Sequence, residues 1–316
     1  MRRAMALAGS VRTRTSPNPW VGTVIEPGGF EGATSPPGGP HAEVMALGAA
    51  GDAARGATLY ATLEPCSHTG RTPPCVDQII DTGIVRVVVA VEDPDERERG
   101  AGIRALRAAG ITVDVGLCAD EVRAQLAPYF KHRSTGRPWV VLKLAATLDG
   151  RTAAPDGTSQ WITGDEARAD AHRLRAESDA VIVGAGTVRA DDPALTVRGV
   201  AGTDPLRVVL GHAPSDAKVQ PALELEGDLG GVLDELGRRG VVQAMVEGGA
   251  TVAGDFHRAG LVDLYVLYLA PAFFGGDDAR PLFAGPGAAT VDDLWRGRLV
   301  SVERLGDDLR LECSPA

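Results

Sequence analysis

The chain is poor in cysteine, with four among its 316 residues. So few cysteines in so long a chain do not form the disulfide framework that holds small secreted domains together. A reducing compartment is therefore expected, and the cytoplasm is the location that fits. Cys118 and Cys313 stand alone and are expected to be buried free thiols. Cys66 and Cys75 remain as the pair that can carry chemistry.

Positive charge is also scarce, because 32 Lys and Arg residues face 42 Asp and Glu residues, and the net charge is −10. Nucleic acid is not expected as the main partner, because phosphate backbones require a basic surface. A small phosphorylated substrate remains compatible, since it needs only a local arginine cluster. The sequence has no run of about 18 apolar residues, so no membrane span is expected. The first twenty residues lack the apolar core and cleavage site of a signal peptide.

The composition is otherwise that of a globular protein, with 44% hydrophobic residues, and the length suggests two domains. In both halves strand-like and helix-like segments alternate, which predicts α/β domains with mostly parallel sheets covered by helices. The short polar turn at 134–138 is the expected boundary, giving domains at 1–135 and 138–316.

In the first half the pattern predicts helices at 2–9, 41–51, 75–83 and 102–110, and strands at 20–27, 57–65, 85–94 and 111–116. In the second half it predicts helices at 164–178 and 229–240, strands at 139–150, 179–188, 205–211 and 261–275, and a strand, glycine turn and helix within 241–260. Glycine after the predicted helices supports their ends.

Two stretches of the first half form a metal-binding pattern. His41 and Glu43 stand two residues apart in HAE, and Cys66 and Cys75 follow, each after a proline. Zinc deaminases hold their metal with one histidine and two cysteines, while the glutamate moves protons. Catalytic zinc sites leave the fourth position to water. We therefore predict one zinc ion per chain on His41, Cys66 and Cys75, with each ligand before or at the start of a helix, and Glu43 as the catalytic proton shuttle.

Simpler interpretations of these residues remain open. His41 and Glu43 could be an exposed cap and an acid at the positive end of a helix dipole. The metal could be structural, with His68 as a fourth ligand. A redox pair is less favoured, because the cysteines are not spaced as C-x-x-C.

The second half has no G-x-G-x-x-G after a strand, so a Rossmann domain is not predicted. Its informative stretches are KLAATLDGR (143–151), GTSQWITG (157–164), the segment 179–198 and MVEGGATVAGDF (245–256). A glycine pair between a strand and a helix lets backbone N–H groups approach a phosphate. Each stretch alone could equally be strand-end packing.

The spacing of the cysteines separates this chain from most zinc deaminases. Cytidine and tRNA adenosine deaminases usually carry P-C-x-x-C, whereas eight residues separate the cysteines in PCSHTGRTPPC. Together with SPNPWVG (16–22), this resembles the bifunctional deaminase/reductase family of riboflavin biosynthesis, and the stretches of the second half resemble the reductase domain of that family. The resemblance covers nearly the whole chain. It implies an N-terminal cytidine-deaminase-like αβα zinc domain followed by a dihydrofolate-reductase-like αβα domain that uses NADPH.

The resemblance also implies binding residues. In the deaminase domain, substrate contacts are implied at Asn18, His68 and Arg71. In the reductase domain, substrate contacts are implied at Ser159, Arg175, Leu195, Arg198 and Glu247, where the two arginines can clamp a ribose phosphate. Cofactor contacts are implied at Ala145, Trp161, Thr187, Asp191, Gly248, Gly249, Ala250 and Thr251, and Asp191 could assist the proton that accompanies the hydride.

The function implied is that of a hydrolase and an oxidoreductase on one chain. The first activity would deaminate 2,5-diamino-6-(5-phosphoribosylamino)pyrimidin-4(3H)-one, and the second would reduce 5-amino-6-(5-phosphoribosylamino)uracil to the ribityl product. A homo-oligomer is expected. Only 17 residues lie at 212–228, where many relatives have more, so the alternative is a zinc deaminase with a weakened reductase-like domain. A nucleoside or tRNA deaminase with an unrelated appendage, and a non-enzymatic zinc module, also remain.

Overall fold

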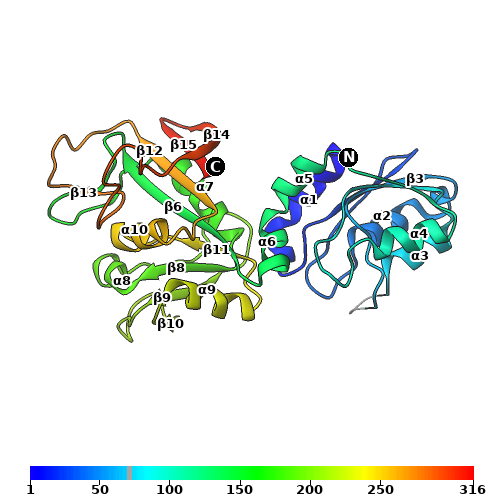
Figure 1. The fold of residues 1–316 in the computed structure, drawn as a ribbon, viewed down its shortest axis with the longest axis horizontal. Coiled ribbons are helices and arrows are strands. Elements are labelled where there is room, and N and C mark those ends of the chain that lie inside the picture. The colour runs from blue at the N-terminus through cyan, green and yellow to red at the C-terminus, as the bar shows by residue number, and fades with distance from the viewer. Residues whose placement is uncertain (70–72) are drawn as a thin grey trace. The chain divides into compact units, whose positions relative to one another are not determined.

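A computed structural model describes residues 1–69 and 73–316 of the chain (Figure 1). The chain divides into two compact units, Met1–Gly136 and Arg137–Ala316. Each unit has its own sheet and its own hydrophobic cores. None of the helices in the described ranges is both long enough and apolar enough to cross a membrane.

The first unit is built on a five-stranded sheet in the order β2-β1-β3-β4-β5. Its strands are β1 (Gly22–Glu26), β2 (Phe30–Ala33), β3 (Thr58–Leu63), β4 (Arg86–Val91) and β5 (Thr112–Val115). Its helices are α1 (Arg2–Thr15), α2 (Ala42–Ala50), α3 (Cys75–Thr82), α4 (Ala101–Ala108), α5 (Ala119–Gln125) and α6 (Ala127–Thr135), with a 3-10 turn η1 (Gly51–Ala54).

Two cores lie on opposite faces of this sheet and make the unit a three-layer structure. One core packs Leu59 and Val87 of the sheet against α2, α3 and α4. The other packs Ala90, whose side chain points to the face opposite that of Val87, against α1, α5 and α6. Figure 1 shows α2, α3 and α4 together on one side of this unit, with α1 and α5 on the other.

The second unit is built on an eight-stranded sheet in the order β10-β9-β8-β11-β6-β12-β15-β14. Its strands are β6 (Trp139–Thr147), β8 (Ala180–Gly184), β9 (Leu206–Leu210), β10 (Leu223–Leu225), β11 (Gln243–Val246), β12 (Leu264–Ala270), β14 (Gly297–Leu305) and β15 (Asp308–Pro315). A small separate sheet pairs β7 (Arg151–Ala153) with β13 (Arg280–Pro281). Its helices are α7 (Asp165–Ala176), α8 (Ala185–Asp191), α9 (Leu229–Arg238) and α10 (Ala250–Arg258).

Cores again fill both faces of this sheet. The core on one face takes side chains from α9 and α10, and the core on the other takes side chains from α7 and α8. The strands from β10 to β12 pair in parallel, and β15 and β14 add an antiparallel edge. Carboxyl ends of parallel strands meet at one edge of a sheet, which is where ligands bind in such folds.

The predicted strands and helices are present, with shifted ends, and four expectations need correction. The sheet of the first unit is mixed, because β1 pairs antiparallel with both β2 and β3. The strand expected at 179–188 ends at Gly184, where α8 begins. The β14–β15 hairpin was not predicted, and β14 lies at the sheet edge with no buried residue. Elements missed elsewhere are β2, α5, α6, β7, β10 and β13. Cys118 and Cys313 are free thiols, as expected, but both are partly exposed rather than buried.

Candidate active sites

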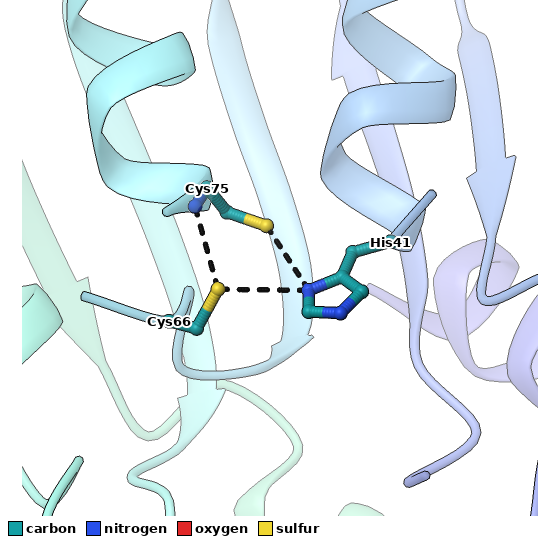
Figure 2. A group of neighbouring side chains, drawn as sticks. All are labelled: His41, Cys66 and Cys75. Atoms are coloured by element: carbon teal, nitrogen blue, oxygen red, sulfur yellow. Dashed lines mark hydrogen bonds between the residues drawn. The ribbon is translucent and has the colours of Figure 1, made fainter. Parts of the chain in front are cut away.

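The structure brings His41, Cys66 and Cys75 together in the first unit (Figure 2). His41 directly precedes α2, Cys66 follows β3, and Cys75 is the first residue of α3. Nδ1 of His41 lies 3.5 Å from the sulfur of Cys66 and 3.3 Å from that of Cys75. All three possible ligand atoms lie within 4.8 Å of one another. One imidazole nitrogen and two sulfurs at this spacing fit a zinc ion with an open fourth position.

The electrostatics of the Cys66 thiol fit metal binding. The Cys75 side chain, His41 and the Cys75 N–H together lower the pKa of the Cys66 thiol to about 4, against the effect of burial. Cys66 and burial raise the pKa of the neighbouring Cys75 thiol, so in the absence of a metal the pair shares one proton. The Cys75 N–H donates to the Cys66 sulfur over 3.3 Å, at the first turn of α3. The expectation that all three ligands precede or begin helices is wrong for Cys66, which lies in a loop. The sulfur of Cys66 nevertheless lies at the positive, N-terminal end of the neighbouring helix α3.

Glu43 lies in the first turn of α2 and is 4% exposed. Burial, followed by the charge of Cys66, raises the pKa of its carboxyl to about 7. It lines a cavity of about 500 Å³ together with His41 and Cys66. A carboxyl that titrates near neutral pH beside a metal position is suited to accept and return protons.

Asn18 and His68, two of the predicted substrate contacts, line the same cavity. Arg71, the third, lies outside the described residues. His68 is not part of the group of possible metal ligands, and its Nδ1 instead donates to Glu98. The structural-zinc interpretation, which needs His68 as a fourth ligand, therefore has no support in the described part of the chain.

Residues that the sequence did not single out complete this cavity. The loop between β4 and α4 contributes Asp93, Asp95, Arg97 and Glu98, and α6 contributes Tyr129 and Arg133. Burial raises the pKa of Asp93 to about 6, although the Asp95 N–H and the Tyr129 hydroxyl donate to its carboxylate and oppose the shift. The signal for these residues was a charged cluster, EDPDERER, directly after a buried strand.

A second cavity, of about 880 Å³, lies in the second unit. It brings together most of the residues that the resemblance implied there: Ala145, Ser159, Trp161, Thr187, Asp191, Glu247, Gly248, Gly249 and Ala250. Partial burial raises the pKa of Asp191, and Arg280, which also lines the cavity, opposes this shift. An elongated ligand fits such a volume better than a single ring does.

Two helix N-termini meet at this cavity. The helix α8 follows β8 directly, and α10 begins just after the glycine pair 248–249 that follows β11. The N–H of Gly249 donates to the Thr187 hydroxyl over 3.2 Å and so ties the two turns together. A Cβ on Gly248 would lie 2.5 Å from Cβ of Val252, so only glycine allows this turn. Exposed N–H groups at such turns suit the phosphates of a nucleotide.

A buried charge cluster forms one wall of the second cavity. Arg175 Nη2 donates to both carboxylate oxygens of Glu247, over 3.0 and 2.7 Å. Burial would raise the pKa of Glu247, but Arg175 and Lys143 lower it below its ordinary value. Lys143 lines the cavity, and burial lowers its pKa. Sequence reasoning missed Lys143, although a lone lysine in the apolar strand WVVLKLAAT is a signal of function.

Four implied residues of the second unit do not line this cavity. Arg175 reaches it only through Glu247, and its Nη1 donates to the Thr196 carbonyl. Leu195 is buried in the core with φ of +53°. The side chains of Arg198 and Thr251 are exposed.

The two halves match known families. Residues 1–91 match the cytidine and deoxycytidylate deaminase zinc-binding region, and residues 138–311 match the RibD C-terminal domain. The riboflavin biosynthesis protein RibD of Aquifex aeolicus is 41% identical, over 98% of this chain and 96% of its own. The chain belongs to the RibD family.

Solved RibD structures have the same fold. RibD of Acinetobacter baumannii (form 1) gives a TM-score of 0.94 at 38% identity, covering 100% of this chain and 97% of its own. The diaminohydroxyphosphoribosylaminopyrimidine deaminase/5-amino-6-(5-phosphoribosylamino)uracil reductase of Thermotoga maritima gives 0.90 at 34% identity, with the same coverage. The RibD-family chain described here is a bifunctional deaminase and reductase of riboflavin biosynthesis that acts on a small pyrimidine and uses zinc and NADPH.

These matches decide between the alternatives. A deaminase with an unrelated appendage is excluded, because the second half matches the RibD C-terminal domain. A weakened reductase is not favoured, because the second half matches the RibD C-terminal domain over residues 138–311.

The chain described here is nevertheless shorter than its relative. The alignment with the Aquifex aeolicus protein spans 344 positions, more than the 316 residues of this chain. Its short segment 212–228 still forms β10, which pairs in parallel with β9.

Proposed function

We propose that the two reactions follow one another on the two units. The unit Met1–Gly136 removes ammonia from 2,5-diamino-6-(5-phosphoribosylamino)pyrimidin-4(3H)-one. The unit Arg137–Ala316 then reduces the ribosyl group of 5-amino-6-(5-phosphoribosylamino)uracil to ribityl. The observation that carries this proposal is the pair of separate cavities, one beside His41, Cys66 and Cys75 and one beside the glycine turn 248–249.

In the deaminase cavity His41, Cys66 and Cys75 would hold zinc, and Glu43 moves protons. A bound zinc ion supplies a water acidic enough to act as a nucleophile near neutral pH. Glu43 would take one proton from the attacking water and give it to the ring nitrogen, and would then carry the second proton of that water to the leaving amine. Its buried carboxyl, with a pKa near 7, can both accept and release a proton at this pH. Asn18, His68 and Arg71 bind the rest of the substrate.

In the reductase cavity the turn from Gly248 to Thr251, with Ala145, Trp161, Thr187 and Asp191, would hold NADPH. The cofactor supplies the hydride, and the protein supplies orientation and the accompanying proton. Asp191 at the rim and Lys143 beside Glu247 are the groups in the cavity placed to supply that proton. Of the implied substrate residues, Ser159 and Glu247 line the cavity and would contact the substrate directly, whereas Arg175, Leu195 and Arg198 lie outside its lining. The contacts of Arg175 support a role in holding Glu247, and Arg198 is the arginine left for a phosphate.

A coupled assay tests the proposal. Zinc-loaded protein receives the diaminopyrimidine ribosyl phosphate with and without NADPH, and ammonia and NADPH are followed together. Ammonia release, followed by NADPH oxidation in step, is expected. Ammonia release without NADPH oxidation at any NADPH concentration would contradict the proposed reductase activity of the second unit.

We further propose a cytoplasmic homo-oligomer. The four unbridged cysteines support a reducing compartment. The edge strand β14 supports oligomerisation, because Leu299, Val300 and Val302 are each more than half exposed, and single copies rarely leave apolar strand edges open. Light scattering measures the mass, and Val300→Lys is expected to lower it. A monomeric wild-type protein would contradict this.

A further inference from the structure

Glu98 is a buried carboxylate that the proposed mechanism does not use. It lies in the loop between β4 and α4, is 5% exposed, and lines the deaminase cavity. A charged group so deeply buried is costly unless it is fully hydrogen-bonded. Its contacts therefore indicate what it does.

Both carboxylate oxygens of Glu98 hold the segment that follows the metal ligand Cys66. One oxygen accepts the Ser67 N–H over 2.8 Å and the Ser67 hydroxyl over 3.1 Å. The other accepts the Nδ1 of His68. Since Nδ1 is engaged, Nε2 is the ring nitrogen of His68 that remains for a substrate.

The loop that carries Glu98 is itself fixed by a second buried carboxylate. Glu64, at the end of β3, accepts the N–H groups of Asp93, Gly100 and Ile103 over 3.1, 2.9 and 3.1 Å. The first turn of α4 packs directly on the same segment, because a Cβ on Gly102 would lie 2.0 Å from the carbonyl oxygen of Pro65. The loop that carries Glu98 is therefore held in place by Glu64. The ring of His68 is partly exposed, and its contact with Glu98 fixes its orientation.

We propose that Glu98 is a positioning residue of the deaminase, which sets the orientation of the His68 ring for the polar ribosyl phosphate part of the substrate. This inference rests on the proposed substrate-binding role of His68. Glu98 acts on substrate binding through His68, and the metal keeps its three ligands without it. The consequence is a substrate affinity that depends on a residue outside the metal site.

Glu98→Gln tests this role in the intact, zinc-loaded chain. The amide has one acceptor oxygen, so it can accept from Ser67 or from the His68 Nδ1–H, but not from both. If it accepts from Ser67, its NH2 group can donate to His68 only when the ring proton moves to Nε2, which reverses the hydrogen-bonding role of the nitrogen that faces the substrate. KM for the diaminopyrimidine ribosyl phosphate is expected to rise about tenfold, which corresponds to one lost charged hydrogen bond. The kcat of ammonia release and the zinc content are expected to change less than about twofold. Glu98→Asp, which keeps both acceptor oxygens, is expected to recover part of the affinity.

The controls separate positioning from a merely structural role. Glu96→Gln removes a charge from an exposed position of the same loop and should leave KM unchanged. NADPH oxidation with the uracil substrate reports on the integrity of the second unit in every variant. A fall in zinc content equal to the loss of activity in Glu98→Gln would overturn the proposal.

A double-mutant cycle with His68→Asn provides the decisive comparison. If Glu98 acts through His68, adding Glu98→Gln to His68→Asn changes KM no further. If the two substitutions instead raise KM independently, so that the double variant shows the product of the two single effects, the proposal would be overturned. A wild-type chain that releases no ammonia would instead refute the proposed deaminase function, so the two failures are distinguishable.

Discussion

At the scale of single residues, the deaminase cavity is organised by carboxyl groups that the fold has buried. Glu43, Glu64, Asp93 and Glu98 are each less than a tenth exposed. Glu64 and Glu98 are fully engaged by N–H and O–H donors, whereas Glu43 and Asp93 have raised pKa values. The first pair therefore shapes the cavity, and the second pair can exchange protons within it.

Replacing Glu43 with Gln is expected to lower the rate of ammonia release by a factor of about 10² to 10⁴, because the amide cannot carry protons. Zinc should stay bound, since Glu43 is not among the three ligands. Ammonia assays and metal analysis check this, with NADPH oxidation on the uracil substrate as control. A Glu43→Gln variant that still releases ammonia at the wild-type rate would contradict the proton-transfer role of Glu43.

The raised pKa of Asp93 makes a prediction about stability against pH. Because its pKa is about 6 in the folded chain and lower when unfolded, the neutral form favours folding, and this contribution is lost as pH rises through 6. Asp93→Asn should therefore stabilise the first unit more at pH 8 than at pH 5, by about 1 kcal/mol. Hydrogen exchange of peptides from residues 1–136 measures this. An equal effect at both pH values would mean that the pKa is not raised.

In the second cavity, Lys143 is the residue whose replacement should be most informative. Lys143→Met keeps the length of the side chain and removes its proton, so NADPH oxidation is expected to fall by a factor of about 10² or more. Ammonia release from the diaminopyrimidine should be unchanged, and both rates are measured on the same sample. Normal NADPH oxidation would leave Asp191 as the proton donor.

Prediction from sequence succeeded at this scale where residue type and spacing carry the chemistry. His41, Cys66 and Cys75 are named by their order alone, and the structure brings them together. Glu98 could not be named, because its partners lie 31 and 30 residues away and its loop has no periodic pattern. The pairing of Arg175 with Glu247 was missed for the same reason, since 72 residues separate them.

At the scale of elements, the site depends on close packing between β2 and α2, the helix that begins beside His41. A Cβ on Gly32 would lie 2.0 Å from the carbonyl oxygen of Ala42 and 2.5 Å from the N of Ala46. These are backbone atoms, so neither can move without displacing the helix. The sequence pattern predicted the helix α2 but not the strand β2, and it contains no information on this close approach.

Gly32→Ala is therefore expected to destabilise the first unit by about 1–3 kcal/mol and to weaken zinc binding. Gly48→Ala, in the helix α2 against which Gly32 packs, is the control, because its Cβ would meet nothing within 4 Å. That change should stabilise the helix by about 0.5–1 kcal/mol. Thermal unfolding and zinc titration of the two variants test the contrast, and similar behaviour of both would contradict it.

At the scale of the whole molecule, the two chemistries use separate sets of residues. All three metal ligands belong to Met1–Gly136, and the second cavity is lined from Arg137–Ala316. The alternating pattern along the sequence predicted two α/β domains, and the polar turn at 134–138 lies at the division. It could not predict the β14–β15 edge, because β14 is mostly exposed and lacks the periodic burial that marks a strand.

Withdrawing zinc with a chelator should abolish ammonia release and leave NADPH oxidation on the uracil substrate close to its original rate. Adding zinc back should restore the first activity. Both rates are followed in one sample before and after chelation. A parallel loss of both would show that the second unit needs the metal as well.

The clamp that Glu64 places on the loop between β4 and α4 has a consequence for how this cavity can evolve. Glu64 holds main-chain N–H groups, which every residue except proline provides. Side chains at 94–99 can therefore be exchanged without altering the path of the loop, whereas an inserted or deleted residue would pull Asp93 and Gly100 out of register with the single carboxylate. Related enzymes should thus diversify this wall by substitution at constant length, and a residue such as Glu98 can arise there in one step.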